Sequence, residues 1–288
     1  MAYNNFIPTI WSETFLHECE QASVYLDDCY TEFQGEIKKR GSEIIFSNVG
    51  TPTVTIKDRD DANEDLPPVE TVPDSAFKMV IRRLALYNYM VGDVDKVQSQ
   101  VDVMKRLMHK QALSVAQQFD YYVAQNALHS NAKKLFAADQ LITAGTTVSG
   151  TSLNVLDAID KAEEALRDNN VPDGAQLVLN CSNRFFTLLR ANMRTLSTDN
   201  KDLLEKGQLR LASGIIVKRS SACPKSTSGD TDYIMLRTRN AIGFAKQMEE
   251  QIPYKPEAKL ADAIKGGVLF DTDLMCPKEM IVLNVKYA

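Results

Sequence analysis

Residues 91–130 read VGDVDKVQSQVDVMKRLMHKQALSVAQQFDYYVAQNALHS, and this stretch decides the architecture. Gly92 and Asp93 supply breaker and cap chemistry, and apolar side chains then recur every three or four positions with no Gly or Pro between them. The apolar stripe consists of Val101, Met104, Met108, Ala112, Val115, Phe119 and Tyr122. This spacing predicts a single helix over about 96–130, about 50 Å long at 1.5 Å per residue. Such a helix exceeds what the core of a 288-residue globule needs, so we expect a rigid spine crossing the molecule, with a coiled coil as the alternative.

The sequence before this helix predicts a long projecting hairpin. Residues 36–58 are rich in β-branched and aromatic side chains and are punctuated by Gly and Pro, which is typical of strands. A polar run at 58–65, closed by Pro67 and Pro68, predicts a solvent-exposed tip. Apolar residues then return over 76–91, which we interpret as a returning strand interrupted by Arg82 and Arg83. The two arms would reach roughly 40–50 Å from a compact body.

The first 34 residues predict an apolar arm. Its large side chains and its proline lie close together: Phe6, Ile7, Pro8, Ile10 and Trp11. The proline cannot easily continue a helix, but the following residues Phe15, Cys19, Ala22 and Leu26 have the spacing of one helical face. A small apolar arm can hardly bury itself alone. We therefore expect it to dock on its own subunit or on a neighbouring copy.

The sequence after the long helix predicts a second lobe of alternating helices and strands. Residues 144–151 are rich in Gly, Thr and Ser and form the best candidate boundary between lobes. Ser152 or Asn154 is a candidate cap for a helix that stops before Pro172, and Ser182 is a candidate cap for another. Strands are predicted at 176–180, 214–218 and 233–236, and through the tail over 241–287, including 267–270 and 280–283.

Composition excludes several classes of protein. With 33 Lys and Arg against 38 Asp and Glu, the net charge of −5 disfavours tight binding to nucleic-acid phosphates, which depends on counterion release by cations. The 5 cysteines include no Cys-x-x-Cys pair, so neither a disulfide framework nor a zinc site is indicated, and a reducing cytosol fits best. We predict no signal peptide and no membrane span, and hence a soluble intracellular protein.

A search for catalytic chemistry finds no convergent set of groups. Phosphate-binding and dinucleotide-binding glycine patterns are absent, and Gly266 and Gly267 are interpreted as a turn before a strand. His17 and Cys19 would point about 200° apart on a helix, so they form no nucleophile pair. The paired carboxylates at 93 and 95 and at 271 and 273 favour capping or turn roles over metal binding. We therefore predict no catalytic residue, no cofactor and no metal site.

Charged residues around the hairpin have two interpretations. The acidic residues at the predicted tip are Asp58, Asp60, Asp61, Glu64 and Asp65. They are either a solvated loop or a surface that docks onto a basic patch of a neighbouring copy. The candidate basic partners are Lys38, Lys39 and Arg40, or Arg82 and Arg83.

At this point the sequence resembles a known family, the major capsid proteins of tailed bacteriophages with the Hong Kong-type capsid fold. The resemblance rests on NFIPTIWS at 5–12, GEIK at 35–38, VGDVDKVQ at 91–98 and GFA at 243–245. It implies an α+β fold and four parts. These are an N-terminal arm at 1–34, an extended β-hairpin loop at 35–91, a peripheral domain with the spine helix at 92–145 and 237–288, and an axial domain at 146–236.

The resemblance also implies a structural function. The chain would assemble with itself, as hexamers and pentamers, into an icosahedral shell around double-stranded DNA, which it would contact weakly at most. It would be found in the virion, after assembly in the host bacterial cytoplasm. Its expected partners are a separate scaffolding protein, a portal and a decoration protein. The alternatives are an encapsulin-type nanocompartment shell, which has the same fold, and an α/β enzyme of another class.

Overall fold

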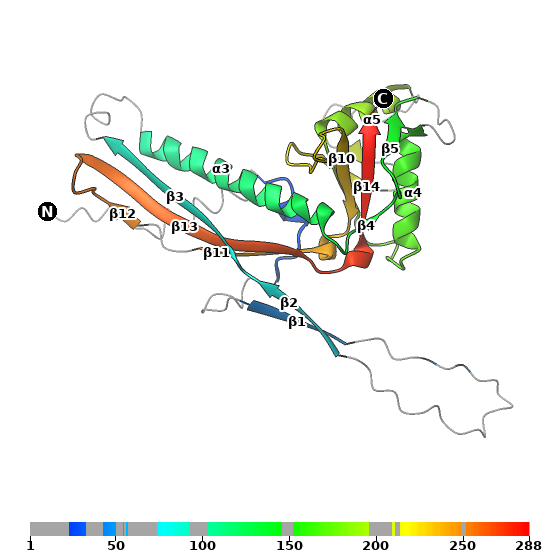
Figure 1. Ribbon diagram of the computed structural model, residues 1–288, viewed down its shortest axis with the longest axis horizontal. Helices are drawn as coiled ribbons and strands as arrows, with labels where there is room; N and C mark the ends of the chain where they lie inside the picture. The colour runs from blue at the N-terminus through cyan, green and yellow to red at the C-terminus, as the bar shows by residue number, and fades with distance from the viewer. Residues whose placement is uncertain are drawn as a thin grey trace, which may run out of the picture.

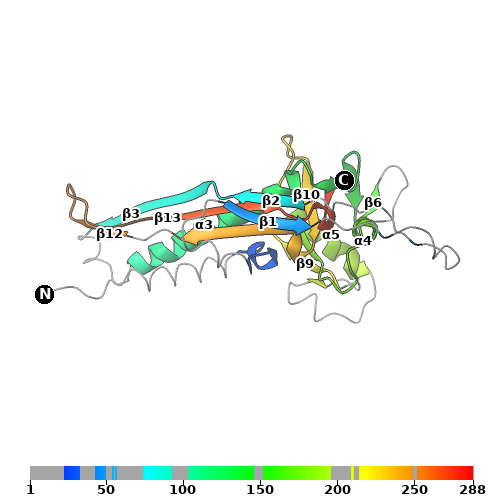
Figure 2. The same ribbon diagram turned by 90° about the horizontal axis from the view of Figure 1, so that it is seen from below.

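The computed structural model describes residues 23–32, 43–49, 54, 56, 74–92, 103–145, 152–195, 209–210, 214–248 and 252–287. Figure 1 shows three parts: an elongated part in which a long helix runs along a sheet, a compact lobe of strands and helices at one end of it, and a narrow hairpin that projects away from both. The turned view in Figure 2 shows the same elongated outline.

In the part of the chain that the structure describes, the elongated part contains the long helix α3 and a sheet of four strands. Helix α3 (Val103–Gln125) ends in the short helix η4 (Asn126–Leu128), so the predicted spine helix is confirmed over the residues that the structure describes. The strands are β3 (Arg83–Gly92), β11 (Ile242–Met248), β12 (Ile252–Tyr254) and β13 (Ala261–Leu274). β13 is the long central strand and pairs antiparallel with each of the other three.

Aromatic side chains hold α3 against this sheet. Phe119 of α3 makes edge-on contacts with Phe244 and Phe270, with ring centroids 5.3 and 4.7 Å apart. Ala112, Val115 and Phe119 of the predicted stripe are all buried, whereas Met108 and Tyr122 are half-buried at its margins. The apolar stripe is therefore the face of a helix lying on a sheet, as a spine requires.

The compact lobe contains helices α4 (Val155–Arg167) and α5 (Asn183–Thr195) and a mixed sheet of order β6-β5-β14-β10-β7-β9-β8, with β4 also paired to β14. The strands are β4 (Lys133–Lys134), β5 (Gln140–Thr143), β6 (Leu153–Asn154), β7 (Val178–Cys181), β8 (Leu209–Arg210), β9 (Ile216–Arg219), β10 (Thr231–Arg237) and β14 (Met280–Tyr287). Both predicted caps are present. The Asn154 side chain accepts a 2.8 Å bond from the Leu156 amide, and Ser182 Oγ accepts one of 3.3 Å from the Phe185 amide.

Strand β14 joins the two cores. Its residues Met280 and Val282 belong to the apolar cluster beneath α3, whereas Ile281 and Leu283 belong to the cluster that includes α4 and α5. Since alternate side chains of a strand point to opposite faces, one strand contributes to both cores. The two parts are therefore packed on a shared strand and are not joined by a loose linker.

The sheet pairings differ from the predicted division of the chain. β4, β5 and β14 lie in the compact-lobe sheet, although 92–145 and 237–288 were predicted to belong with the spine. Residues 83–92 pair with β13, although 35–91 was predicted to be hairpin. The returning strand predicted over 76–91, with its interruption at Arg82 and Arg83, is two strands, because the chain changes pairing partner at 81–82. Pairing partners far apart in sequence leave no local signal, which explains these differences.

Gly266 lies in the middle of β13 and not in the predicted turn. A Cβ atom at this position would lie 2.7 Å from the Tyr87 hydroxyl oxygen and 2.9 Å from the adjacent ring carbon. Tyr87, its directly opposed partner on β3, is buried in the cluster beneath α3. The missing side chain thus makes room for a core tyrosine.

Gly266→Ala is expected to lower the free energy of unfolding by about 1–3 kcal/mol, because the added methyl group forces the buried Tyr87 ring to move. Urea unfolding followed by circular dichroism measures this. Gly174→Ala is the matched control, since a Cβ there meets nothing within 4 Å, and it should change stability by less than about 0.5 kcal/mol. Equal effects of the two substitutions would contradict the assigned role of Gly266.

Candidate subunit-contact surfaces

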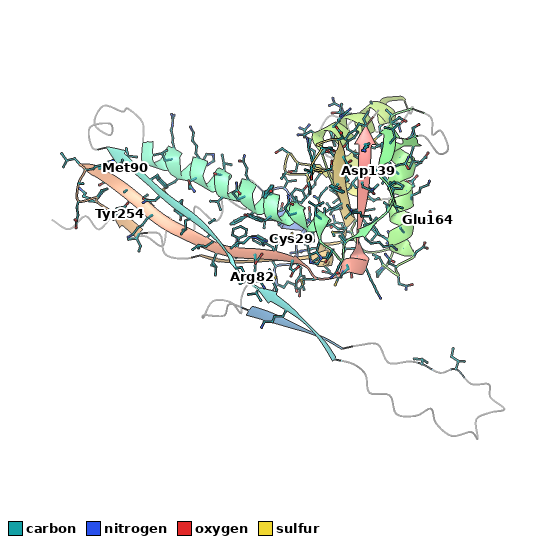
Figure 3. The ribbon with its side chains drawn as sticks, in the orientation of Figure 1. Cys29, Arg82, Met90, Asp139, Glu164 and Tyr254 are labelled. Atoms are coloured by element: carbon teal, nitrogen blue, oxygen red, sulfur yellow. The ribbon has the colours of Figure 1, made fainter. Side chains whose placement is uncertain are left out.

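Most of the predicted contact residues lie outside the residues that the structure describes. These are Phe6, Ile7, Pro8, Ile10, Trp11, Lys38, Lys39, Arg40, Asp58, Asp60, Asp61, Glu64 and Asp65. Their contacts remain predictions. Arg82 and Arg83 are described. Arg82 lies where the projecting hairpin meets the elongated part (Figure 3), and Arg83 is the first residue of β3.

Within the described residues, the paired part of the projecting hairpin is β1 (Glu43–Val49) and β2 (Asp74–Val80). The two strands pair antiparallel along their whole length, from Glu43 opposite Val80 to Val49 opposite Asp74. Beyond β1, Val54 and Ile56 are 81% and 90% exposed. The hairpin therefore carries large apolar side chains that its own subunit leaves uncovered.

A buried carboxylate fixes the root of the hairpin. Asp271 of β13 forms an ion pair with Arg83 and accepts a 3.2 Å hydrogen bond from the Arg82 amide. The Arg83 guanidinium also lies over the Tyr122 ring, 4.6 Å from its centroid. Arg83 is thus held within its own subunit and sets the direction in which the hairpin leaves. The exposed Arg82 side chain makes no ion pair with any residue of the described ranges, which leaves it as the better candidate for a contact between copies.

The position of Asp271 corrects one prediction. Asp271 and Asp273 were expected in a turn or a helix cap, but both lie within β13. Asp273 is 3.6 Å from His129 Nε2, the residue that follows η4. No group of three or more His, Cys, Asp or Glu side chains suited to a metal ion occurs within the described part of the chain.

Asp271→Asn is expected to lower stability by about 1–2 kcal/mol, because one carboxamide cannot replace both carboxylate oxygens as acceptors for the Arg83 side chain and the Arg82 amide. Hydrogen exchange at 80–84 should become faster. Asp273→Asn is the control: its contact with His129 is partly exposed, which predicts a loss of less than about 1 kcal/mol. If exchange at the hairpin root were the same in both variants, Asp271 would not be the anchor.

The face of the sheet opposite α3 carries an apolar patch. Leu84, Leu86 and Met90 of β3 are 43%, 73% and 48% exposed, and Ile252 of β12 is 44% exposed. They share this face because Tyr87 and the other odd-numbered residues of β3 point toward α3. We call these four residues the outer-face patch. Figures 1 and 2 show α3 along only one face of the sheet.

Residues 23–29 cross the junction between the elongated part and the compact lobe. Asp120 of α3 accepts hydrogen bonds from Ser23 Oγ and from the amides of Val24 and Tyr25, the latter two at 2.9 and 3.1 Å. Burial raises the pKa of the Asp120 carboxyl group, and these three bonds oppose that effect. Asp120 is thus an acceptor that attaches the start of this segment to the spine.

Arg237 holds the other end of the segment. Its side chain is fully buried, and its guanidinium donates to the carbonyls of Asp28 and Tyr25 and, at 3.0 Å, to Asn180 Oδ1 of β7. Asp28 in turn binds Lys218 of β9 at 2.7 Å. Sequence reasoning did not single out Arg237. The sequence signal that could have indicated it is the position of this arginine, directly after the apolar strand residues Tyr-Ile-Met-Leu at 233–236.

A polar cavity of about 270 Å³ lies beside the start of α5. Its lining includes Arg184, Lys225, Cys223 and Tyr287, and the Tyr287 hydroxyl donates a 2.7 Å bond to Asp232. Burial and this bond raise the pKa of Tyr287, and burial raises that of Cys223. A thiol that resists ionisation is a poor nucleophile, so the cavity offers no activated catalytic group of this kind.

Among the described helices, none combines the length and the apolar composition needed to cross a membrane.

Comparison with known proteins identifies the fold. No protein-family model matches the chain, and no curated protein matches it. Solved structures do. A structure of Mycobacterium phage Che8 aligns with a TM-score of 0.68 at 19% identity, covering 91% of this chain and 90% of the other. The capsid of Cyanophage P-SCSP1u aligns with a TM-score of 0.69 at 16% identity, covering 92% and 89%.

A virus-like particle from Pyrococcus furiosus also aligns, with a TM-score of 0.56 at 12% identity, covering 94% of this chain and 96% of the other. The chain therefore has the architecture of shell-forming proteins. The prediction of an α+β fold of the Hong Kong capsid type is confirmed.

Proposed function

We propose that this chain is the major capsid protein of a tailed phage, which assembles with copies of itself into the icosahedral head around double-stranded DNA. The observation that carries the proposal is the uncovered apolar surface on a capsid fold. Val54 and Ile56 on the hairpin and the outer-face patch on the sheet are exposed in the single chain. Exposed large apolar side chains of this kind, gathered on one face, mark contacts with other molecules.

The geometry suits contacts that repeat around a shell. A hairpin that projects from one copy can cover the outer-face patch of the next, which is a head-to-tail contact that closes into rings when the rotation allows it. Each large side chain that becomes fully covered contributes about 1.5–3 kcal/mol. Many such contacts acting together hold a shell although each one alone is weak.

The remaining parts of the proposal follow from this assembly. The N-terminal arm, the hairpin loop, the peripheral domain and the axial domain are its building units, with axial domains meeting as hexamers and pentamers. A separate scaffolding protein, a portal and a decoration protein are the proposed partners. Packaged DNA is contacted weakly, in keeping with the net charge of −5. The protein would assemble in the bacterial cytoplasm and remain in the virion, with no enzymatic activity.

A nanocompartment shell is the second candidate. The structural similarity to a virus-like particle from Pyrococcus furiosus favours it. Neighbouring genes separate the two candidates: portal and terminase genes indicate a phage head, and a cargo-enzyme gene indicates a compartment. An α/β enzyme is the alternative of a different class.

Negative-stain microscopy of the expressed chain, alone and with its neighbouring gene product, tests the proposal. We expect closed particles of megadalton mass. A small oligomer of constant size under all conditions would overturn the shell and favour an enzyme. Particles that enclose a co-expressed enzyme in place of DNA would favour the nanocompartment.

A further inference from the structure

One face of α3 is covered at one end and exposed at the other. Arg106, Leu113, Gln117 and Asp120 recur at the helical spacing and therefore share this face. At its C-terminal end, residues 23–26 cover it through the bonds to Asp120 and the packing of Val24 and Leu26. Toward the N-terminus of α3, Arg106, Leu113 and Gln117 are exposed.

The direction of the chain indicates what covers the exposed end. From Ser23 at Asp120, the chain runs to Asp28, which contacts Arg237 and Lys218 in the compact lobe. A chain that keeps this direction before Ser23 would approach Asp120 from the opposite side, along the N-terminal half of α3. The covered end of the face continues directly into the exposed end.

The sequence before Ser23 has the composition that this face requires. Phe15, Cys19 and Ala22 fall on one side of a helix, which gives an apolar stripe for Leu113 to contact. Residues 12–22 contain three glutamates and no lysine or arginine, whereas the exposed end of the α3 face is flanked by Arg106 and Lys110. Opposite charges beside an apolar stripe favour this pairing and its orientation.

We propose that residues 12–22 form a helix that lies parallel to α3 of the same subunit, on the face of α3 that carries Leu113, Gln117 and Asp120. Both helices rise 1.5 Å per residue. With Ser23 level with Asp120, Phe15 then lies within one residue, about 1.5 Å along the axis, of Leu113, and Cys19 lies equally close to the level of Gln117. Residue 12 then lies level with His109, so the arm's first apolar cluster, at 6–11, leaves the proposed helix near the N-terminal end of α3, where it is free to reach a neighbouring copy. The inference concerns the single subunit and does not depend on the proposed shell.

Crosslinking to the native Cys19 tests this placement. Gln117→Cys puts a thiol on the proposed contact face. Gln118→Cys, the control, puts one about 100° further around the same helix and away from Asp120. Both glutamines are exposed, so neither change should disturb folding. The full chain is treated with a short bismaleimide reagent, separated on a denaturing gel and mapped by mass spectrometry.

We expect a link within one chain between Cys19 and position 117, migrating as a monomer and at least five-fold more abundant than any link to position 118. A link to position 117 that migrates as a dimer would overturn the proposal, since a neighbour's arm would then occupy the face. Links of equal abundance in the two variants would also overturn the proposal. So would the absence of any link in variants whose circular dichroism spectra show that they are folded.

A second variant tests the same face without crosslinking. Leu113→Asp should speed hydrogen exchange over 12–22 at least five-fold, because the charge removes the apolar contact for Phe15. Ser114→Asp, at the adjacent exposed position, is the control and should leave that exchange unchanged. Unchanged exchange over 12–22 in the Leu113 variant would overturn the placement.

Discussion

Arg237→Met is expected to lower the free energy of unfolding by about 3–5 kcal/mol, the largest effect of any single change that the structure suggests. The side chain is 0% exposed. Its removal leaves the Asp28 carbonyl and Asn180 Oδ1 without their buried donor. Methionine fills most of the volume but supplies no N–H group. Urea unfolding measures the loss, and hydrogen exchange over 23–30 should rise with it, because Arg237 holds this segment to β10.

Arg190→Met on α5 is the matched control. Arg190 is exposed, so the same substitution there should change stability by less than about 0.5 kcal/mol. If both variants unfolded at the same urea concentration, the buried guanidinium would not be a structural anchor. If stability fell but hydrogen exchange over 23–30 did not change, Arg237 would stabilise the sheet without holding the N-terminal segment in place.

The elements that the sequence predicted are those specified by local chemistry. The stripe from Ala112 to Phe119 predicted the spine helix because a period of 3.6 residues with no Gly or Pro leaves few alternatives. Asn154 and Ser182 were recognised as caps because a side-chain acceptor before an apolar run meets the need of free amide groups. Each of these signals lies within about one helical turn of the element it defines.

The features that the sequence did not predict depend on partners far along the chain. Arg237 meets Asp28, 209 positions earlier, and Asp271 meets Arg83, 188 positions earlier. Gly266 resembled a turn residue in the sequence. The Tyr87 ring, which occupies the space that a side chain at 266 would fill, is brought there only by sheet pairing. In the same way β14 reads as a simple tail strand, although its two faces serve two different cores.

The candidate contact surfaces also depend on partners far along the chain. Arg82 and Arg83 are adjacent in sequence and were predicted together as basic partners for a neighbouring copy. The structure separates their roles, because Asp271 binds the Arg83 side chain but only the main chain of Arg82. The outer-face patch was not predicted as a patch, since the alternation along β3 shows two faces without showing which one α3 covers.

Leu86→Asp is expected to abolish particle formation while leaving the subunit folded. Leu86 is 73% exposed, so the charge costs the isolated subunit little, but a neighbouring copy that covers the outer-face patch must bury it. An uncompensated buried carboxylate costs several kcal/mol at each contact, and in the proposed shell every subunit would repeat that contact. Size-exclusion chromatography and negative-stain microscopy should therefore show small species in place of particles.

Leu86→Met separates loss of assembly from loss of fold. Methionine keeps an apolar side chain of similar volume, so this variant should form particles as the unaltered chain does. Circular dichroism should give the same spectrum and the same unfolding midpoint for both variants, since an exposed position contributes little to the core. Particles formed normally by the aspartate variant would show that the patch faces solvent in the shell, and the contact between copies would then have to be sought on another surface of the elongated part.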